Sequence, residues 1–163
     1  MTSRDPTDEG FTDAQRAQID RRRIDQDRTL LAMHELEEAL GTAAPAREAR
    51  WQEAVVHALG VLDEATRDEA RNAEQPDSLL SDIAFNQRRL RNRVRGLRSQ
   101  YRQLSESIDA LRREFAQPDD AAVDFADIRQ RLAGLLTALR HQRARESDLI
   151  YEAYYEAFQA ELR

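Results

Sequence analysis

The sequence predicts an all-α protein, an antiparallel up-down-up-down four-helix bundle. Apolar residues recur at steps of three and four through most of the 163 residues, which is the period of a helix with one buried face. The 5 Gly and 4 Pro residues fall at a few places, so long helices are separated by short turns. Short turns place consecutive helices antiparallel. A hydrophobic content of 40% with 34% charged residues suits long helices that each expose one face.

The first half of the chain predicts a tail and two helices. Residues 1–11 are polar and contain Pro and Gly, so they are expected to form a disordered tail that precedes a bundle over residues 12–163. Thr12 and Gln15 fit a capping box at the start of a helix over about 13–40. Gly41 is expected to end this helix in a left-handed cap. Pro45 then precedes a second helix over about 46–71.

The second half predicts two longer helices. Asp77 or Ser78 is expected to cap a helix over about 78–116, whose single apolar face is uninterrupted and includes Asn86 as a polar core residue that sets the register. A fourth helix is expected over about 121–161. Because the third and fourth helices are longer than the first two, their hairpin is expected to project. Its apolar stripes then need cover from the N-terminal tail, a second copy in a homodimer, or a protein partner.

The composition excludes several classes of chemistry. The chain has no Cys, which excludes disulfides, thiolate metal sites and Cys nucleophiles. All 25 basic residues are Arg, so Schiff-base chemistry and Walker-type phosphate loops lack their Lys. There is also no Ser/His/Asp grouping or Gly-rich loop. We therefore expect that the protein is not an enzyme.

Charge and hydropathy predict which classes of partner the protein binds and where it is located. A net charge of −6 argues against a nucleic-acid binder. The run at residues 88–102 is basic without an acid; it is expected to pair with acids on adjacent helices, and phosphate or an acidic partner is the alternative. No apolar run approaches the ~20 residues that span a bilayer. The N-terminus does not fit a signal peptide, so no membrane association and a cytoplasmic location are expected.

One carboxylate lies within the apolar stripe of the last helix. Leu139, Glu146 and Ile150 share one helical face in the stretch 135–158. A buried carboxylate is costly unless a metal, a cation or a hydrogen-bond donor meets it. Two interpretations of Glu146 follow: ligation of a metal, or an ion pair with an Arg of the third helix such as Arg93.

The same stretch carries a resemblance to a known family. The sequence HQRARE, with His141 and Glu146, followed by SDLIYEAYYEAF, resembles the last helix of the hemerythrin-like (HHE cation-binding) family. The resemblance covers roughly residues 27–158 and implies a four-helix bundle that holds iron with histidines and carboxylates. It implies the metal ligands His34, His57, His141 and Glu146. The set is incomplete, because Val61 stands where family members carry a carboxylate and the third helix has no His.

Two functions are therefore predicted. The first is a hemerythrin-like module that binds or senses iron or a small gas at a degenerate site, with iron as its cofactor. The alternative is a metal-free helical scaffold or protein-interaction protein that acts through the hairpin of the third and fourth helices. In that case the three histidines are ordinary residues at the boundary of the core.

Overall fold

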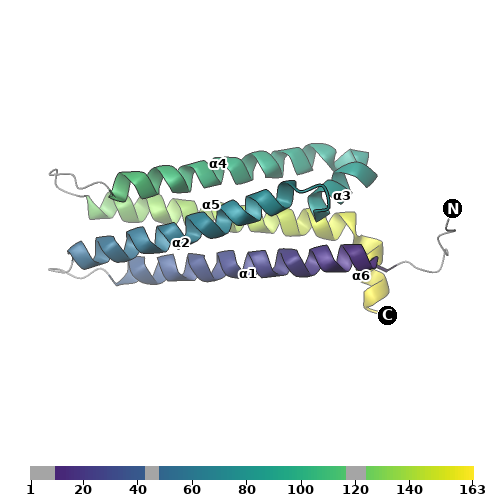
Figure 1. The fold of residues 1–163 in the computed structure, drawn as a ribbon, viewed down its shortest axis with the longest axis horizontal. Helices are drawn as coiled ribbons and strands as arrows, with labels where there is room; N and C mark the ends of the chain where they lie inside the picture. Colours follow the sequence, from purple (N-terminus) through teal and green to yellow (C-terminus); the bar gives the residue numbers. More distant parts are fainter. Residues whose placement is uncertain (1–9, 43–47, 117–123) are drawn as a thin grey trace.

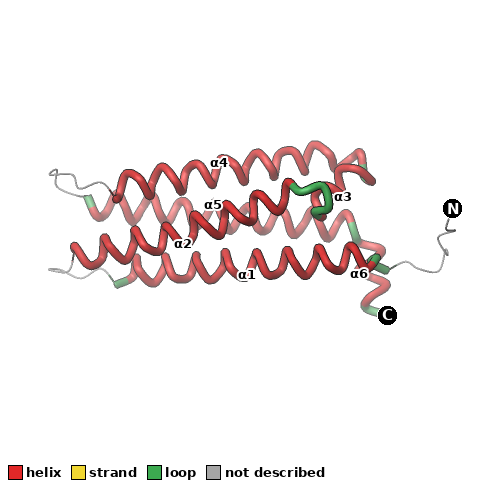
Figure 2. The backbone as a smooth tube through the Cα atoms, in the orientation of Figure 1, coloured by secondary structure: helices red, strands yellow, loops and turns green. Residues whose placement is uncertain are grey.

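The computed structural model describes residues 10–42, 48–116 and 124–163, and every regular element in these ranges is helical. The prediction of an all-α protein is confirmed. Figure 1 shows the long helices side by side along the long axis, and Figure 2 shows the same path coloured by secondary structure. The elements in chain order are α1 (Asp13–Gly41), α2 (Glu48–Glu74), α3 (Leu79–Asn86), a 3-10 turn η1 (Arg88–Leu90), α4 (Arg91–Ala116), α5 (Phe125–Ala153) and α6 (Tyr155–Glu161).

Local hydrogen bonds set the helix starts. Thr12 and Gln15 form the predicted capping box at the start of α1. Ser78, one of the two predicted caps, accepts a hydrogen bond from the backbone of Ser81 at the start of α3. Asp124 caps α5 in the same way. Each side chain satisfies a backbone N–H that has no partner within its own helix.

The expectation of one uninterrupted helix over 78–116 is wrong. The chain leaves helical geometry at Gln87, where φ is −128° and ψ is 88°, between α3 and α4. The side-chain amide of Gln87 donates to the carbonyl of Ala153, the last residue of α5. The predicted last helix is also interrupted, at Tyr154, so both breaks lie at one end of the molecule. Asn86, expected in the core, is exposed and hydrogen-bonds to Asp82 instead.

The lengths of the long helices also differ from the prediction. Helix α1 has 29 residues, α2 has 27, α4 has 26 and α5 has 29, so the later pair is not longer than the earlier pair. Helices α4 and α5 therefore run beside α1 and α2 and do not project as a separate hairpin (Figure 1). Helix α1 includes Gly41, and its cap Thr42 has a φ of −90°, so no left-handed cap forms there.

Buried apolar side chains form two clusters along the molecule. The first joins α1, α2, α4 and α5 and includes Leu36, Leu59 and Leu132. The second joins α3, the start of α4 and the end of α5. Phe11, which the prediction assigns to the disordered tail, is buried in this second cluster against Tyr154. Residues 1–9 of that tail lie outside the described residues, as do 43–47 and 117–123, where the predicted second and fourth helices begin.

Hydropathy along the helices bears on membrane insertion. Within the described ranges, no helix combines the length and the apolar character that crossing a bilayer requires.

Candidate functional site

The structure does not bring the four predicted metal ligands together. The side chain of His34 is 61% exposed and lies 3.4 Å from Glu37, and that of His57 is 73% exposed and lies 3.7 Å from Glu35. His141 is also exposed, whereas Glu146 is buried. Among the described residues, no three His, Asp or Glu side chains are grouped so that they could hold a metal ion. The physical reason is rotation about the helix axis, because each histidine lies away from the stripe that its helix buries.

Glu146 is paired with an arginine, although not the expected one. Its Oε1 accepts a hydrogen bond of 3.1 Å from Nε of Arg22, which comes from α1. Arg93, the partner suggested by the sequence, instead pairs with Glu152 on the surface. Glu146 is 3% exposed, so this ion pair supplies the cation that a buried carboxylate needs.

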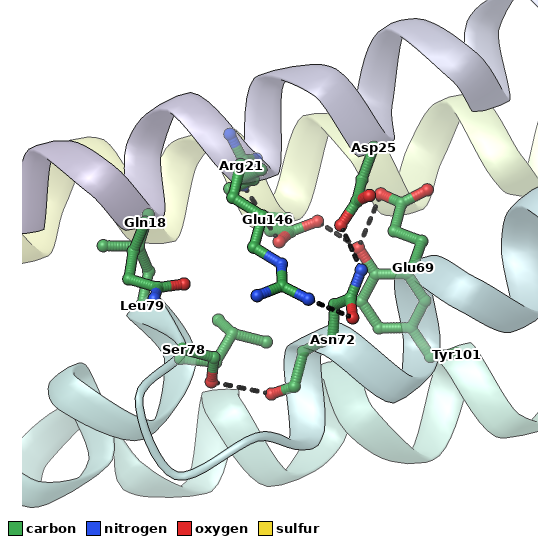
Figure 3. Close-up of a pocket in the computed structure, with 12 residues that line it drawn as sticks. Gln18, Arg21, Asp25, Glu69, Asn72, Ser78, Leu79, Tyr101 and Glu146 are labelled. Carbon is green, nitrogen blue, oxygen red and sulfur yellow. Dashed lines mark hydrogen bonds and ion pairs between the residues drawn. The ribbon is translucent and has the colours of Figure 1, made fainter.

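Two further buried side chains complete a polar layer around Glu146. Tyr101 of α4 donates its hydroxyl hydrogen to Oε2 of Glu146, and its oxygen lies 3.1 Å from Oε1 of Glu69 on α2. Thr29 of α1 donates to Oε2 of Glu69 over 2.6 Å. Figure 3 shows Glu69, Tyr101 and Glu146 converging between the helices. The four long helices each contribute to this layer, which we call the carboxyl-tyrosine layer: Arg22 and Thr29, Glu69, Tyr101, and Glu146.

The number of hydrogens in this layer favours a proton on Glu69. Burial, the largest cause, raises the pKa of Tyr101 well above its usual range, so the phenol stays protonated and has one hydrogen for two carboxyl neighbours. Burial also raises the pKa of Glu69; the nearby charge of Glu146 raises it further, and the hydrogen bond from Thr29 opposes both. A protonated Glu69 donates to Tyr101, Tyr101 donates to Glu146, and Arg22 balances the one remaining negative charge. Every contact in the layer then contains a hydrogen.

A small cavity lies beside the carboxyl-tyrosine layer. Its volume is about 40 Å³, and Glu69, Tyr101 and Glu146 form part of its wall. On another side, Arg21 donates to Asn72 over 3.3 Å and Asn72 donates to Asp25 over 2.7 Å. Since a water needs at least ~10–15 Å³ of such volume and drug-sized ligands occupy ~300–1,000 Å³, the cavity fits only water-sized occupants. The carboxyl-tyrosine layer beside it joins the four long helices through buried hydrogen bonds and one ion pair.

Sequence reasoning missed Glu69, Tyr101 as a polar partner, and Arg22. A signal for Glu69 was present, because it follows Leu62 by seven residues and Ala65 by four and so lies on the buried stripe of its helix. The same test singled out Glu146. Arg22 lies within the run Arg21–Arg23, where nothing in the sequence distinguishes the arginine that turns inward.

Comparison with known proteins does not place the chain in a family. No protein-family model, no curated protein and no solved structure matches the chain.

Proposed function

We propose that the protein is a helical scaffold, an antiparallel up-down-up-down bundle that binds another protein through the end where α3 and α6 lie. The observation that carries this proposal is a set of exposed aromatic side chains at that end. Phe85 of α3 is 83% exposed, and Tyr151 and Tyr155 are each about half exposed. Aromatic residues are enriched where proteins bind one another, because they bury a large area and lose little conformational freedom.

The interior supports a structural role. The cavity beside the carboxyl-tyrosine layer admits water-sized occupants, and the ionised Glu146 is already paired with Arg22. Both apolar clusters are filled by side chains along the length of the helices. These features suit a rigid support that presents a surface.

The metal and gas function implied by the hemerythrin-like resemblance stays a prediction. Iron bound by His34, His57, His141 and Glu146 would give the purified protein a stoichiometric metal content. Replacing His141 and Glu146 together with Ala would then remove the metal. Elemental analysis of both proteins tests this function directly.

Site-specific photo-crosslinking tests the scaffold function. Phe85 is replaced by p-benzoylphenylalanine in the full chain, the chain is expressed in its native host, and cross-linked products are identified by mass. Leu31 of α1, which is 70% exposed, is replaced in the same way as the matched control. We expect one discrete adduct at position 85 and none at position 31. Equal yields at the two positions, or no adduct at position 85, would contradict the proposal, and an adduct of twice the chain mass would identify a homodimer.

A further inference from the structure

A shallow groove of about 410 Å³ lies on the surface where α4 faces α5. Arg93 and Gln100 of α4 line it together with Arg145 of α5, and Nη1 of Arg145 donates to Gln100 over 3.0 Å. A Cβ placed on Gly96 would meet no atom within 4 Å, so the groove is open at this residue. The full lining is Arg93, Gly96, Leu97, Ser99, Gln100, Gln103 and Arg145. This lining contains guanidinium, amide and hydroxyl groups and no carboxylate.

The groove lies in the most basic part of the chain. Residues 88–105 contain no Asp or Glu, and their arginines are at positions 88, 89, 91, 93, 95, 98 and 102. The structure shows which of these arginines are neutralised within the chain. Arg89 and Arg93 share the single carboxylate of Glu152, and Arg102 lies 3.8 Å from Glu74.

Arg98 points inward, where it donates to Ser81 and to a backbone carbonyl. Two other arginines of this run keep their charge available. Arg88 and Arg95 are exposed, and no ion pair joins either of them to a carboxylate of the described chain. Arg95 precedes Ser99 by four residues, so it stands one helical turn from a residue that lines the groove. Positive charge without an internal partner therefore borders the groove.

We propose that this groove receives an acidic segment of a partner protein, whose carboxylates pair with Arg95 and Arg145. The guanidinium groups offer fixed pairs of N–H donors to carboxylates. Gln100, Gln103 and the Ser99 hydroxyl can bond the peptide groups of the segment. This inference rests on the proposed scaffold function and adds the chemistry of its partner.

The lining favours a protein segment over a nucleic acid. Single-stranded nucleic acids are held by aromatic side chains on which bases stack, and the groove contains none. The net charge of the chain is −6, so beyond the immediate neighbourhood of these arginines its surface repels a long polyanion. A short acidic segment needs only the local charge.

Binding of a fluorescein-labelled oligoglutamate peptide to the full chain at low salt tests the proposal by anisotropy. The groove is altered by Gly96→Leu and, separately, by Arg95→Glu with Arg145→Glu. The matched controls are Gly134→Leu, at an exposed glycine of α5 with equally open space, and Arg50→Glu, at an exposed arginine of α2. We expect both groove variants to weaken binding about tenfold or more. We expect the controls to bind as the wild type does.

Amide chemical shifts of the wild type give a readout that requires no variant. Signals of Gly96, Ser99 and Gln103 are expected to move on addition of the peptide. The proposal is overturned if the peptide does not bind, if the controls weaken binding as much as the groove variants do, or if a single-stranded oligonucleotide of equal charge binds more tightly. A dimer in light scattering that the Arg95→Glu, Arg145→Glu variant dissolves would also overturn it, because the groove would then hold a second copy. If the photo-crosslinker at position 85 still gives its adduct in the groove variants, the scaffold function holds and only this inference about the groove fails.

Discussion

The hydroxyl oxygen of Tyr101 lies 3.1 Å from Oε1 of Glu69 and also contacts Oε2 of Glu146, so one phenol from α4 joins carboxyl groups of α2 and α5. The hydroxyl has one hydrogen and two carboxyl neighbours. The two carboxyl groups therefore have different roles. Burial raises the pKa of Glu69, which favours its protonated form, and Glu146 forms the ion pair with Arg22.

We predict opposite tolerance of amide substitution at the two glutamates. Glu69→Gln keeps a donor toward Tyr101 and an acceptor for Thr29 and needs no bound proton, so the free energy of unfolding should stay the same or rise. Glu146→Gln leaves Arg22 without its ionic partner, and the free energy of unfolding should fall by about 2 kcal/mol or more. Urea denaturation of both variants at neutral pH measures the difference. Equal destabilisation by the two substitutions would refute the assignment of the proton to Glu69.

Stability should depend on pH through Glu69. Because the pKa of Glu69 is raised in the folded chain, its contribution to stability is fully present below the unfolded pKa and is lost as the pH rises through the folded pKa. The difference in urea midpoint between Glu69→Gln and the wild type should therefore grow in favour of the variant as the pH is raised. A midpoint difference that stays constant with pH would show that Glu69 does not titrate differently on folding.

Removal of the Tyr101 hydroxyl should lower the free energy of unfolding substantially, although the substitution deletes only one oxygen atom. Tyr101→Phe leaves two buried carboxyl groups without their shared partner, and the expected loss is about 1–3 kcal/mol of unfolding free energy. Tyr155→Phe is the matched control, since Tyr155 is about half exposed and its loss of a hydroxyl should change stability by no more than about 0.5 kcal/mol. Thermal unfolding followed by circular dichroism compares the two. Similar melting temperatures for the two variants would contradict the role of Tyr101.

The breaks that end α3 and α5 should be coupled through Gln87. Its side-chain amide donates to the carbonyl of Ala153, so Gln87→Ala removes a hydrogen bond between segments far apart in the sequence. The expected loss is about 1 kcal/mol. Hydrogen exchange should become faster around Tyr154 and α6, while the first apolar cluster stays protected. Faster exchange spread evenly over all helices would instead indicate global destabilisation.

The all-helical class and the starts of α1 and α3 were predictable because their causes are local. The Thr12 and Gln15 capping box and the Ser78 cap involve groups three residues apart, which a sequence pattern states directly. The break at Gln87 was not predictable in this way. Its apolar neighbours continue the helical period across the break, and the hydrogen bond to Ala153 comes from a segment 66 residues away.

The site was predictable only in part. The stripe pattern identified Glu146 as a buried carboxylate that needs a partner, and the structure confirms its burial. The partner was not identified, because Arg22 is 124 residues distant and looks like its neighbours in the sequence. The three histidines show the converse limit. A resemblance to a known set of ligands does not decide that the residues share a site, because the rotation of each helix turns the side chain inward or outward.

By itself, the sequence determined a helical protein without Cys or Lys, the apolar stripes that face one another, and the caps at which helices begin. These features depend on residue type and on hydrogen bonds within one turn. Only the tertiary structure decided that Glu69, Tyr101, Glu146 and Arg22 meet, that the histidines face outward, and which arginines pair with which carboxylates. Those outcomes depend on how each helix is rotated about its own axis when the apolar stripes pack together. Packing also brings together groups that are distant along the chain, which a local sequence pattern does not show.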